Sequence, residues 1–155
     1  MKKEYKIIPY KQIGTYSFGT HREDIINIIG KPLSSTKYGF PVSNRLLDEY
    51  EFFSMMYSNK LELEAVEFCP DYTDNVITFL YGNKKVKIHG TIKEIINNFK
   101  IITNDMIWDE NEEEYSSNKL GINIFCPDNH IENILFYDLH YYDEENNYLK
   151  ENNIL

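Results

Sequence analysis

The sequence lacks several features that would assign it to a functional class directly. Its 155 residues include only two cysteines, Cys69 and Cys126, without C-x-x-C spacing, so no disulfide framework or redox motif is predicted. No apolar run approaches the ~18 residues that a membrane-spanning helix requires, and the opening "MKKEYKIIPYKQIG" has no apolar secretion-signal core. We therefore expect a cytoplasmic protein without membrane contact.

Basic charge is also scarce. The chain carries 16 Lys and Arg residues against 25 Asp and Glu residues, a formal net charge of -9, and its lysines are scattered along the sequence. Binding to nucleic acid requires a basic patch that displaces counterions from phosphate. We expect no nucleic-acid partner, and the charge balance favours a basic protein as partner.

Signatures of catalysis and of cofactor binding are missing as well. The seven glycines form neither of the common phosphate-binding motifs, and the four histidines lie in no familiar local signature. We predict no cofactor, no metal and no catalytic residue. An alternative is a small enzyme of another type, for which Cys126, Asp128, His130 and His140 would have to converge in space.

Two similar stretches indicate a repeat. "GTHREDII" spans residues 19–26 and "GTIKEII" spans residues 90–96. Each contains a T-x-x-E capping box, with Thr20 and Glu23 in the first and Thr91 and Glu94 in the second. In the first, Ile25, Ile28 and Ile29 fall on one helical face. Two short amphipathic helices are therefore predicted, starting 71 residues apart.

Strand-forming segments recur at the same offset. Residues 49–55 and 120–126 are predicted strands, and each is followed by a turn and a second strand, at 61–68 and 131–137. A rival register, from the duplicated strings "SNKL" and "FCPD" at offsets of 59 and 57, is out of step with the helices. Residues 75–90 are predicted to form a strand, a turn and a short strand. Two long loops are predicted, at residues 31–45 and 103–118.

Hydrophobic alternation predicts a sheet with one dry and one wet face. Leu61, Leu63 and Ala65 alternate with Glu62 and Glu64, and a similar alternation places Asn123 on the wet side. We predict an α+β fold with two diverged repeats of a short helix packed on an antiparallel sheet, the sheets side by side with an open face. The single domain covers 1–155, with repeats at about 13–82 and 84–143 and a C-terminal tail at 144–155.

The run "WDENEEEY" at residues 108–115 combines acidic side chains with flanking aromatics. Such runs are commonly solvated loops, but aromatic anchors and steering carboxylates also suit a protein-binding surface. The predicted partner-binding residues are Glu62, Glu64, Trp108, Asp109, Glu110, Glu112, Glu113, Glu114, Tyr115, Asn123, Phe125, Tyr141, Tyr142 and Asp143.

Two segments resemble a known family. "GTYSFGTHREDIINIIGKP" resembles the opening of small bacterial units of the β-lactamase inhibitor protein type, and "KLGINIFCPDNHIENILFYDLHYYDEE" resembles the second-repeat ending of proteins from toxin–immunity neighbourhoods. The resemblance implies tandem repeats whose open sheet surface holds another protein through aromatic and acidic side chains.

The predicted function is a non-enzymatic module that binds and inhibits another protein. Specifically, we expect an immunity protein that neutralises a bacterial toxin or enzyme by stoichiometric binding. A small enzyme with a site near Cys126 and His130, or a structural homodimer, are the alternatives, and no particular oligomeric state is predicted.

Overall fold

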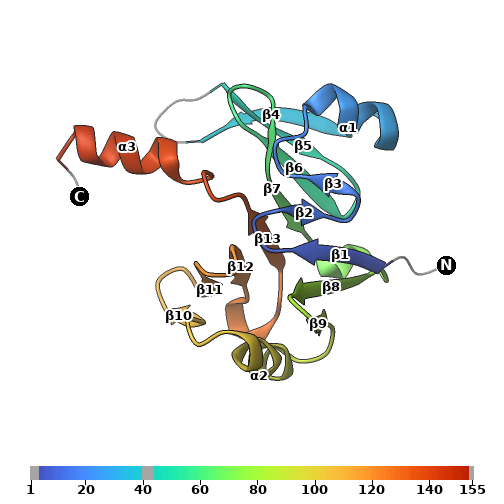
Figure 1. Cartoon of the computed structure of the whole chain (residues 1–155), viewed down its shortest axis with the longest axis vertical. Coiled ribbons are helices and arrows are strands. Elements are labelled where there is room, and N and C mark those ends of the chain that lie inside the picture. Colours follow the sequence, from blue (N-terminus) through green and yellow to red (C-terminus); the bar gives the residue numbers. More distant parts are fainter. Residues whose placement is uncertain (1–3, 40–43, 154–155) are drawn as a thin grey trace.

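The computed structural model describes residues 4–39 and 44–153, and these form an α+β fold with three helices and two sheets (Figure 1), which confirms the predicted fold class. The helices are α1 (Arg22–Ile29), α2 (Ile92–Ile102) and α3 (Asp143–Glu151). The five-stranded sheet runs, in spatial order, β3 (Tyr16–Ser17), β2 (Gln12–Ile13), β1 (Glu4–Ile8), β8 (Val76–Tyr81) and β9 (Lys84–Ile88). The eight-stranded sheet runs β10 (Ile107–Asp109), β11 (Glu114–Ser117), β12 (Ile122–Phe125), β13 (Asn133–Tyr137), β7 (Leu63–Phe68), β6 (Phe53–Tyr57), β5 (Arg45–Glu49) and β4 (Ser34–Tyr38).

The eight-stranded sheet consists of two four-stranded meanders, each preceded by a helix. Helix α1 precedes β4 to β7, and α2 precedes β10 to β13. The last strands of the two meanders, β7 and β13, pair antiparallel with Phe68 opposite Ile134, so the halves lie side by side. The two copies of "SNKL" lie in turns that are not equivalent, β6–β7 and β11–β12, so the rival register does not describe the fold.

The five-stranded sheet contains segments that were predicted to belong to the two repeats. Strands β8 and β9, within residues 75–90 at the junction of the two predicted repeats, pair with the N-terminal strand β1 and not with the meanders. Strand β1 runs parallel to β8, with Tyr5 opposite Ile77. The turn at Gly82 and Asn83 lies where it was predicted. Of the predicted tail at 144–155, residues 144–151 lie in α3, and 154–155 lie outside the described residues.

Both predicted long loops contain strands. Residues 31–45 include β4, although 40–43 lie outside the described residues, and 103–118 include the β10–β11 hairpin. Conversely, the predicted strand at 49–55 spans the turn between β5 and β6. Strand β4 is a polar, largely exposed edge strand, so it carries little of the apolar periodicity from which strands are predicted.

The helix starts differ from each other. In α2 the predicted capping box is present, because Thr91 Oγ1 accepts from Glu94 N and Glu94 Oε2 accepts from Thr91 N, both at 3.2 Å. The box predicted at Thr20 is wrong. Its hydroxyl instead donates to the Ser17 carbonyl in the turn after β3, and His21 caps α1 through Nδ1.

The core lies between the eight-stranded sheet on one side and the five-stranded sheet and two helices on the other. Phe79 of β8 packs edge-to-face on Phe99 of α2, with ring centroids 5.3 Å apart, and also stacks on Phe136 of β13. Helix α1 buries only Ile25, whereas Ile28 is 72% exposed, so the predicted three-isoleucine face of this helix is incomplete.

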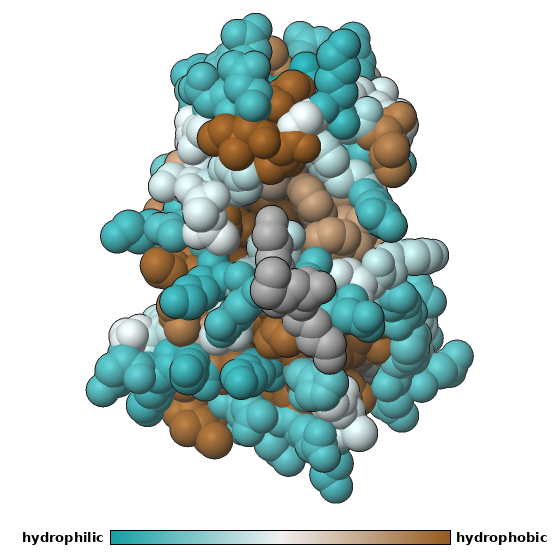
Figure 2. Space-filling view, turned by 90° about the vertical axis from the view of Figure 1, so that its right-hand side faces the viewer, coloured by the Kyte–Doolittle hydropathy of each residue, from teal (hydrophilic) through white to brown (hydrophobic). Residues whose placement is uncertain are grey.

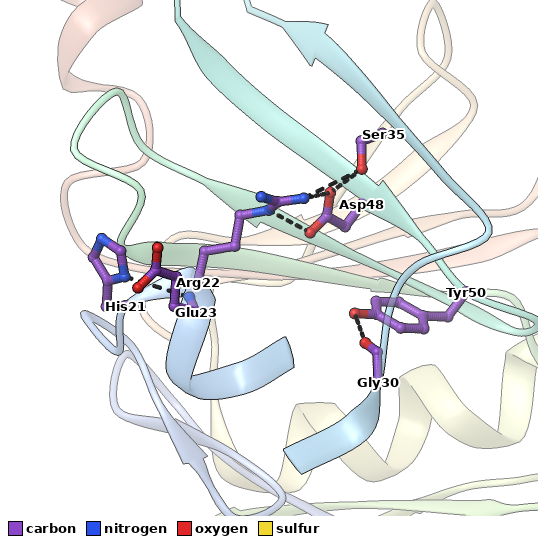
Figure 3. A network of polar contacts seen from close by, with 7 residues as sticks. All are labelled: His21, Arg22, Glu23, Gly30, Ser35, Asp48 and Tyr50. Carbon is purple, nitrogen blue, oxygen red and sulfur yellow. Dashed lines mark hydrogen bonds and ion pairs between the residues drawn. The ribbon is translucent and has the colours of Figure 1, made fainter. Parts of the chain in front are cut away.

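An ion pair fastens α1 to the sheet (Figure 3). The Arg22 guanidinium donates to both carboxylate oxygens of Asp48 in β5, at 2.7 and 3.1 Å, and Ser35 Oγ of β4 donates to the same carboxylate at 2.6 Å. The Asp48 side chain is fully buried, while that of Arg22 retains 24% exposure. At the other end of the helix, the Tyr50 hydroxyl donates to the Gly30 carbonyl at 3.0 Å.

Candidate protein-binding surface

One face of the eight-stranded sheet is turned away from the five-stranded sheet and the core; we call it the open face. A single cross-strand row traverses six strands of it. The residues of this row are Ser116, Asn123, Leu135, Glu67, Ser54 and Glu49. A second row joins Asp109, Glu114, Phe125 and Asn133. At the usual ~4.8 Å between strands, the first row is about 24 Å long, a width suited to a protein partner.

The charge on the open face is almost entirely negative. Glu67 is half-buried near its centre, and burial together with the neighbouring Glu49 raises the pKa of its carboxyl. Burial and two acidic neighbours likewise raise the pKa of Glu114. Among the side chains that the described strands of the eight-stranded sheet direct to the open face, Arg45 is the only basic one, and it is already bonded to Glu64.

Glu64 reaches the open face because β7 contains a bulge. Met56 pairs with Ala65 but Tyr57 pairs with Leu63, which leaves Glu64 as an extra residue. Leu63 consequently faces the main core while Ala65 faces the open side. The prediction that Leu63 and Ala65 share one dry face is therefore wrong. Glu64 lies on the open face, as predicted, but it is buried there and only 9% exposed.

A buried polar cluster surrounds Glu64. Arg45 Nε donates to Glu64 Oε1 at 2.6 Å, and the Tyr38 hydroxyl donates to the same oxygen. The guanidinium also lies over the rings of Tyr38 and Tyr141, at 4.5 and 5.1 Å from their centroids. Burial raises the pKa of Glu64, and the contacts with Tyr38 and Arg45 oppose that effect.

Tyr141 and Tyr142 cover one end of the open face. The Tyr141 hydroxyl donates to Met56 Sδ at 3.6 Å, and Asn123 Nδ2 donates to the Tyr142 hydroxyl at 2.9 Å. The two rings pack edge-to-face with each other and both contact Tyr137. The predicted pair therefore lies on the predicted surface, but it is held there by the protein's own residues.

Beside these tyrosines lies an open cleft of about 570 Å³. It brings together four predicted residues, Glu62, Glu64, Tyr141 and Asp143. Asp143 Oδ2 is bonded to His140 Nδ1 at 2.8 Å. Glu62 is exposed just before β7, and its backbone forms an isolated antiparallel β-bridge with His21. The cleft is an acidic extension of the open face.

The acidic run 109–114 forms the end of the β10–β11 hairpin, and its side chains point in different directions. Asp109 and Glu114 are a cross-strand pair on the open face, whereas Trp108 and Tyr115 pack against each other on the opposite side, with centroids 4.8 Å apart and the rings tilted by 50°. Glu110, Glu112 and Glu113 are exposed in the turn. Trp108 and Tyr115 therefore do not share a surface with the carboxylates beside them in sequence, because side chains alternate along a strand.

The side chains of the alternative enzyme site do not converge. Cys126 is buried in the core, His130 is exposed with Nε2 2.7 Å from Asp71 Oδ2, and His140 binds Asp143 in the cleft. Within residues 4–39 and 44–153, no cluster of three or more His, Cys, Asp or Glu side chains could hold a metal ion. No described helix has the length and apolar character needed to cross a membrane.

Three residues of the open face were missing from the predicted set: Glu67 and Leu135 near its centre, and Glu49 further out. Glu67 is two residues from Ala65 and therefore shares its face of β7. It could have been predicted to lie on the open face had the bulge at Glu64, which changes the side-chain alternation, been known. Glu49 was the first residue of the strand predicted at 49–55, but it is in fact the last residue of β5, so the alternation of that predicted strand did not apply to it.

We compared the chain with models of protein families, with curated proteins and with solved structures, and none of the three comparisons gave a match. The geometry and charge of the open face are therefore the basis for a functional assignment.

Proposed function

We propose that this protein binds a basic partner protein through the open face, and that it acts as a cytoplasmic immunity protein that neutralises a bacterial toxin by stoichiometric binding. The observation that carries the proposal is the position of Glu67. Its half-buried carboxylate lies between Leu135 and Ser54 in the middle of the face, and it has no ion-pair partner among the described residues.

A lysine or arginine of the partner would find Glu67 in a partly dehydrated setting, where attraction between opposite charges is stronger than in water. Leu135 and Phe125 are half-buried beside the carboxylates and supply apolar area at the centre of the contact. Glu49, Asp109 and Glu114 lie further out and would steer the encounter.

The proposed relationship to the β-lactamase inhibitor protein type agrees with this choice of surface, because tandem members of that family hold another protein on the open side of the sheet. The charge distribution supports the same face independently of the resemblance, since only one basic side chain of the eight described strands lies on the open face, and it is bonded to Glu64.

The test is complex formation with the product of a toxin-like reading frame encoded beside this one. We expect a stoichiometric complex by calorimetry that weakens as salt is added, and protection of cells that express the toxin. Glu67→Lys should weaken binding by about 1.5 kcal/mol or more, at least ~tenfold, and Glu49→Lys should weaken it less.

Asp74→Lys is the matched control. Asp74 is exposed in the loop before β8, away from the open face, and its substitution changes the formal charge by the same two units. Equal loss of affinity in Asp74→Lys and Glu67→Lys, with both variants folded, would reject the open face as the binding surface. The absence of any salt-sensitive complex with the neighbouring product would reject the immunity function.

A further inference from the structure

A partly enclosed apolar pocket lies on the other side of the eight-stranded sheet, away from the open face. It has a volume of about 270 Å³ and is bounded by β1, the β2–β3 turn, the end of α1, and the inward faces of β6 and β7. Figure 2 views the side of the molecule that carries α1 and β1, with apolar side chains gathered near the α1 end above a hollow with an apolar floor.

The deep part of the pocket has apolar walls. Ile13, Met55, Val66 and Phe68 line it and are at most 3% exposed. They come from both sheets, which face each other across the core at this point. A cavity with such walls favours an apolar guest over water, since water needs two or more polar partners to be held.

Aromatic side chains make up much of the remaining wall. Tyr5, Tyr16, Phe53 and Phe68 line the pocket, and the Tyr5 and Phe68 rings are tilted at 56° with centroids 5.6 Å apart. Such rings present edges and faces that pack well against a further aromatic ring. The thioether of Met55 adds a polarisable contact of the same kind.

The rim supplies the polar groups. Glu4 and Thr15 are its exposed members, and Glu4 is the only charged residue that lines the described pocket. Its carboxylate already accepts a hydrogen bond from the Thr78 hydroxyl at 2.7 Å. Among the described residues, no basic side chain lines the pocket to neutralise an anionic guest.

We propose that this pocket binds a neutral aromatic small molecule, with an apolar ring system buried against Met55, Val66 and Phe68 and a polar group at the rim. A cavity of about 150 Å³ accommodates benzene, so a guest of one to two fused rings fits this volume. The site is separate from the open face, and its occupancy does not depend on the proposed partner.

Indole is a suitable probe because it is neutral, fused and carries one hydrogen-bond donor. The assay is methyl NMR of the methionine-labelled full chain during an indole titration. The Met55 methyl should shift saturably, whereas the Met56 methyl, which faces the opposite side of the sheet and is 7% exposed, should stay in place. No Met55 shift up to the solubility limit, or equal shifts at both methyls, would overturn the proposal.

Helix α1 offers a matched pair of variants. Ile29 lines the pocket and is half-buried, while its neighbour Ile28 is exposed and does not. Ile29→Trp should fill the pocket and weaken indole binding at least tenfold, whereas Ile28→Trp should change it less than twofold. Indole carboxylate should bind more weakly than indole. Unchanged affinity in a folded Ile29→Trp variant would contradict the assignment. If that variant does not fold, the shifts of the Met55 and Met56 methyl signals in the unaltered protein test the proposal.

Discussion

Replacement of Arg22 by methionine should strip the buried Asp48 carboxylate of its cation while keeping the length and helix propensity of the side chain. Asp48 would lose hydrogen bonds of 2.7 and 3.1 Å from the guanidinium and retain only the one from Ser35 Oγ. Because its side chain has no exposed area, water cannot replace the lost donors.

The expected loss follows from those two bonds. Each charge-assisted hydrogen bond contributes about 1.5–3 kcal/mol, and removal of one partner of a buried ion pair typically costs about 3–5 kcal/mol. We expect Arg22→Met to lower the free energy of unfolding by about 3–5 kcal/mol. For a chain of this length, that corresponds to a decrease in Tm of roughly 6–20 °C.

Chemical denaturation of the unaltered protein, Arg22→Met, Asp48→Leu and the double variant tests this reasoning. Asp48→Leu should cost less than Arg22→Met because the Arg22 side chain, 24% exposed, can turn to solvent. The double variant should lie within about 1.5 kcal/mol of Asp48→Leu alone, since it leaves no buried charge. A loss below about 1 kcal/mol in Arg22→Met, as is usual for exposed pairs, would show that the pair does not hold α1 in place.

Three further predictions follow from single residues. Gly121→Ala should destabilise by about 2 kcal/mol or more, measured by thermal unfolding, because Gly121 has φ +64° and a Cβ would lie 2.8 Å from the Tyr10 ring; a neutral result would contradict the close packing there. Tyr57→Phe should be neutral or stabilising by up to about 1 kcal/mol in the same measurement, because the buried Tyr57 hydroxyl has no hydrogen-bond partner among the described residues; a clear loss of stability would reveal a partner. The hydrogen bond that His130 Nε2 donates to Asp71 raises the pKa of His130. The stabilising contribution of this contact is therefore fully present below the ordinary pKa of about 6.5 and is lost as pH rises through the raised value. NMR titration should show Asp71→Asn returning the pKa of His130 towards 6.5, and an unchanged pKa would exclude the contact.

Much of the repeat architecture could be predicted because it rests on short-range patterns. The second capping box, at Thr91 and Glu94, depends on residues three apart and formed as expected. The alternation of Leu120, Ile122 and Ile124 also held, with all three fully buried. In such segments local geometry and burial favour the same structure.

The rest depended on long-range contacts that leave little local pattern. Strand β4 is stabilised by pairing with β5 and not by a buried face of its own. The bulge at Glu64 reverses the phase of β7, and no feature of "LELEAVEF" distinguishes it from a regular strand. Placement of Glu64 beside Arg45 and Tyr38 therefore required the three-dimensional structure, as did the identification of Glu67 as the centre of the open face.

The seam between β7 and β13 also determines when this protein can finish folding during synthesis. Ala65 pairs with Tyr137 and Tyr5 pairs with Ile77, each across 72 residues of chain. Each meander can form locally, but both sheets stay incomplete until these distant strands meet, which makes folding slow relative to a protein built from local contacts. Until β13 has left the ribosome, β7 exposes an unpaired apolar edge, so the nascent chain is most prone to aggregation at what later becomes the middle of its largest sheet.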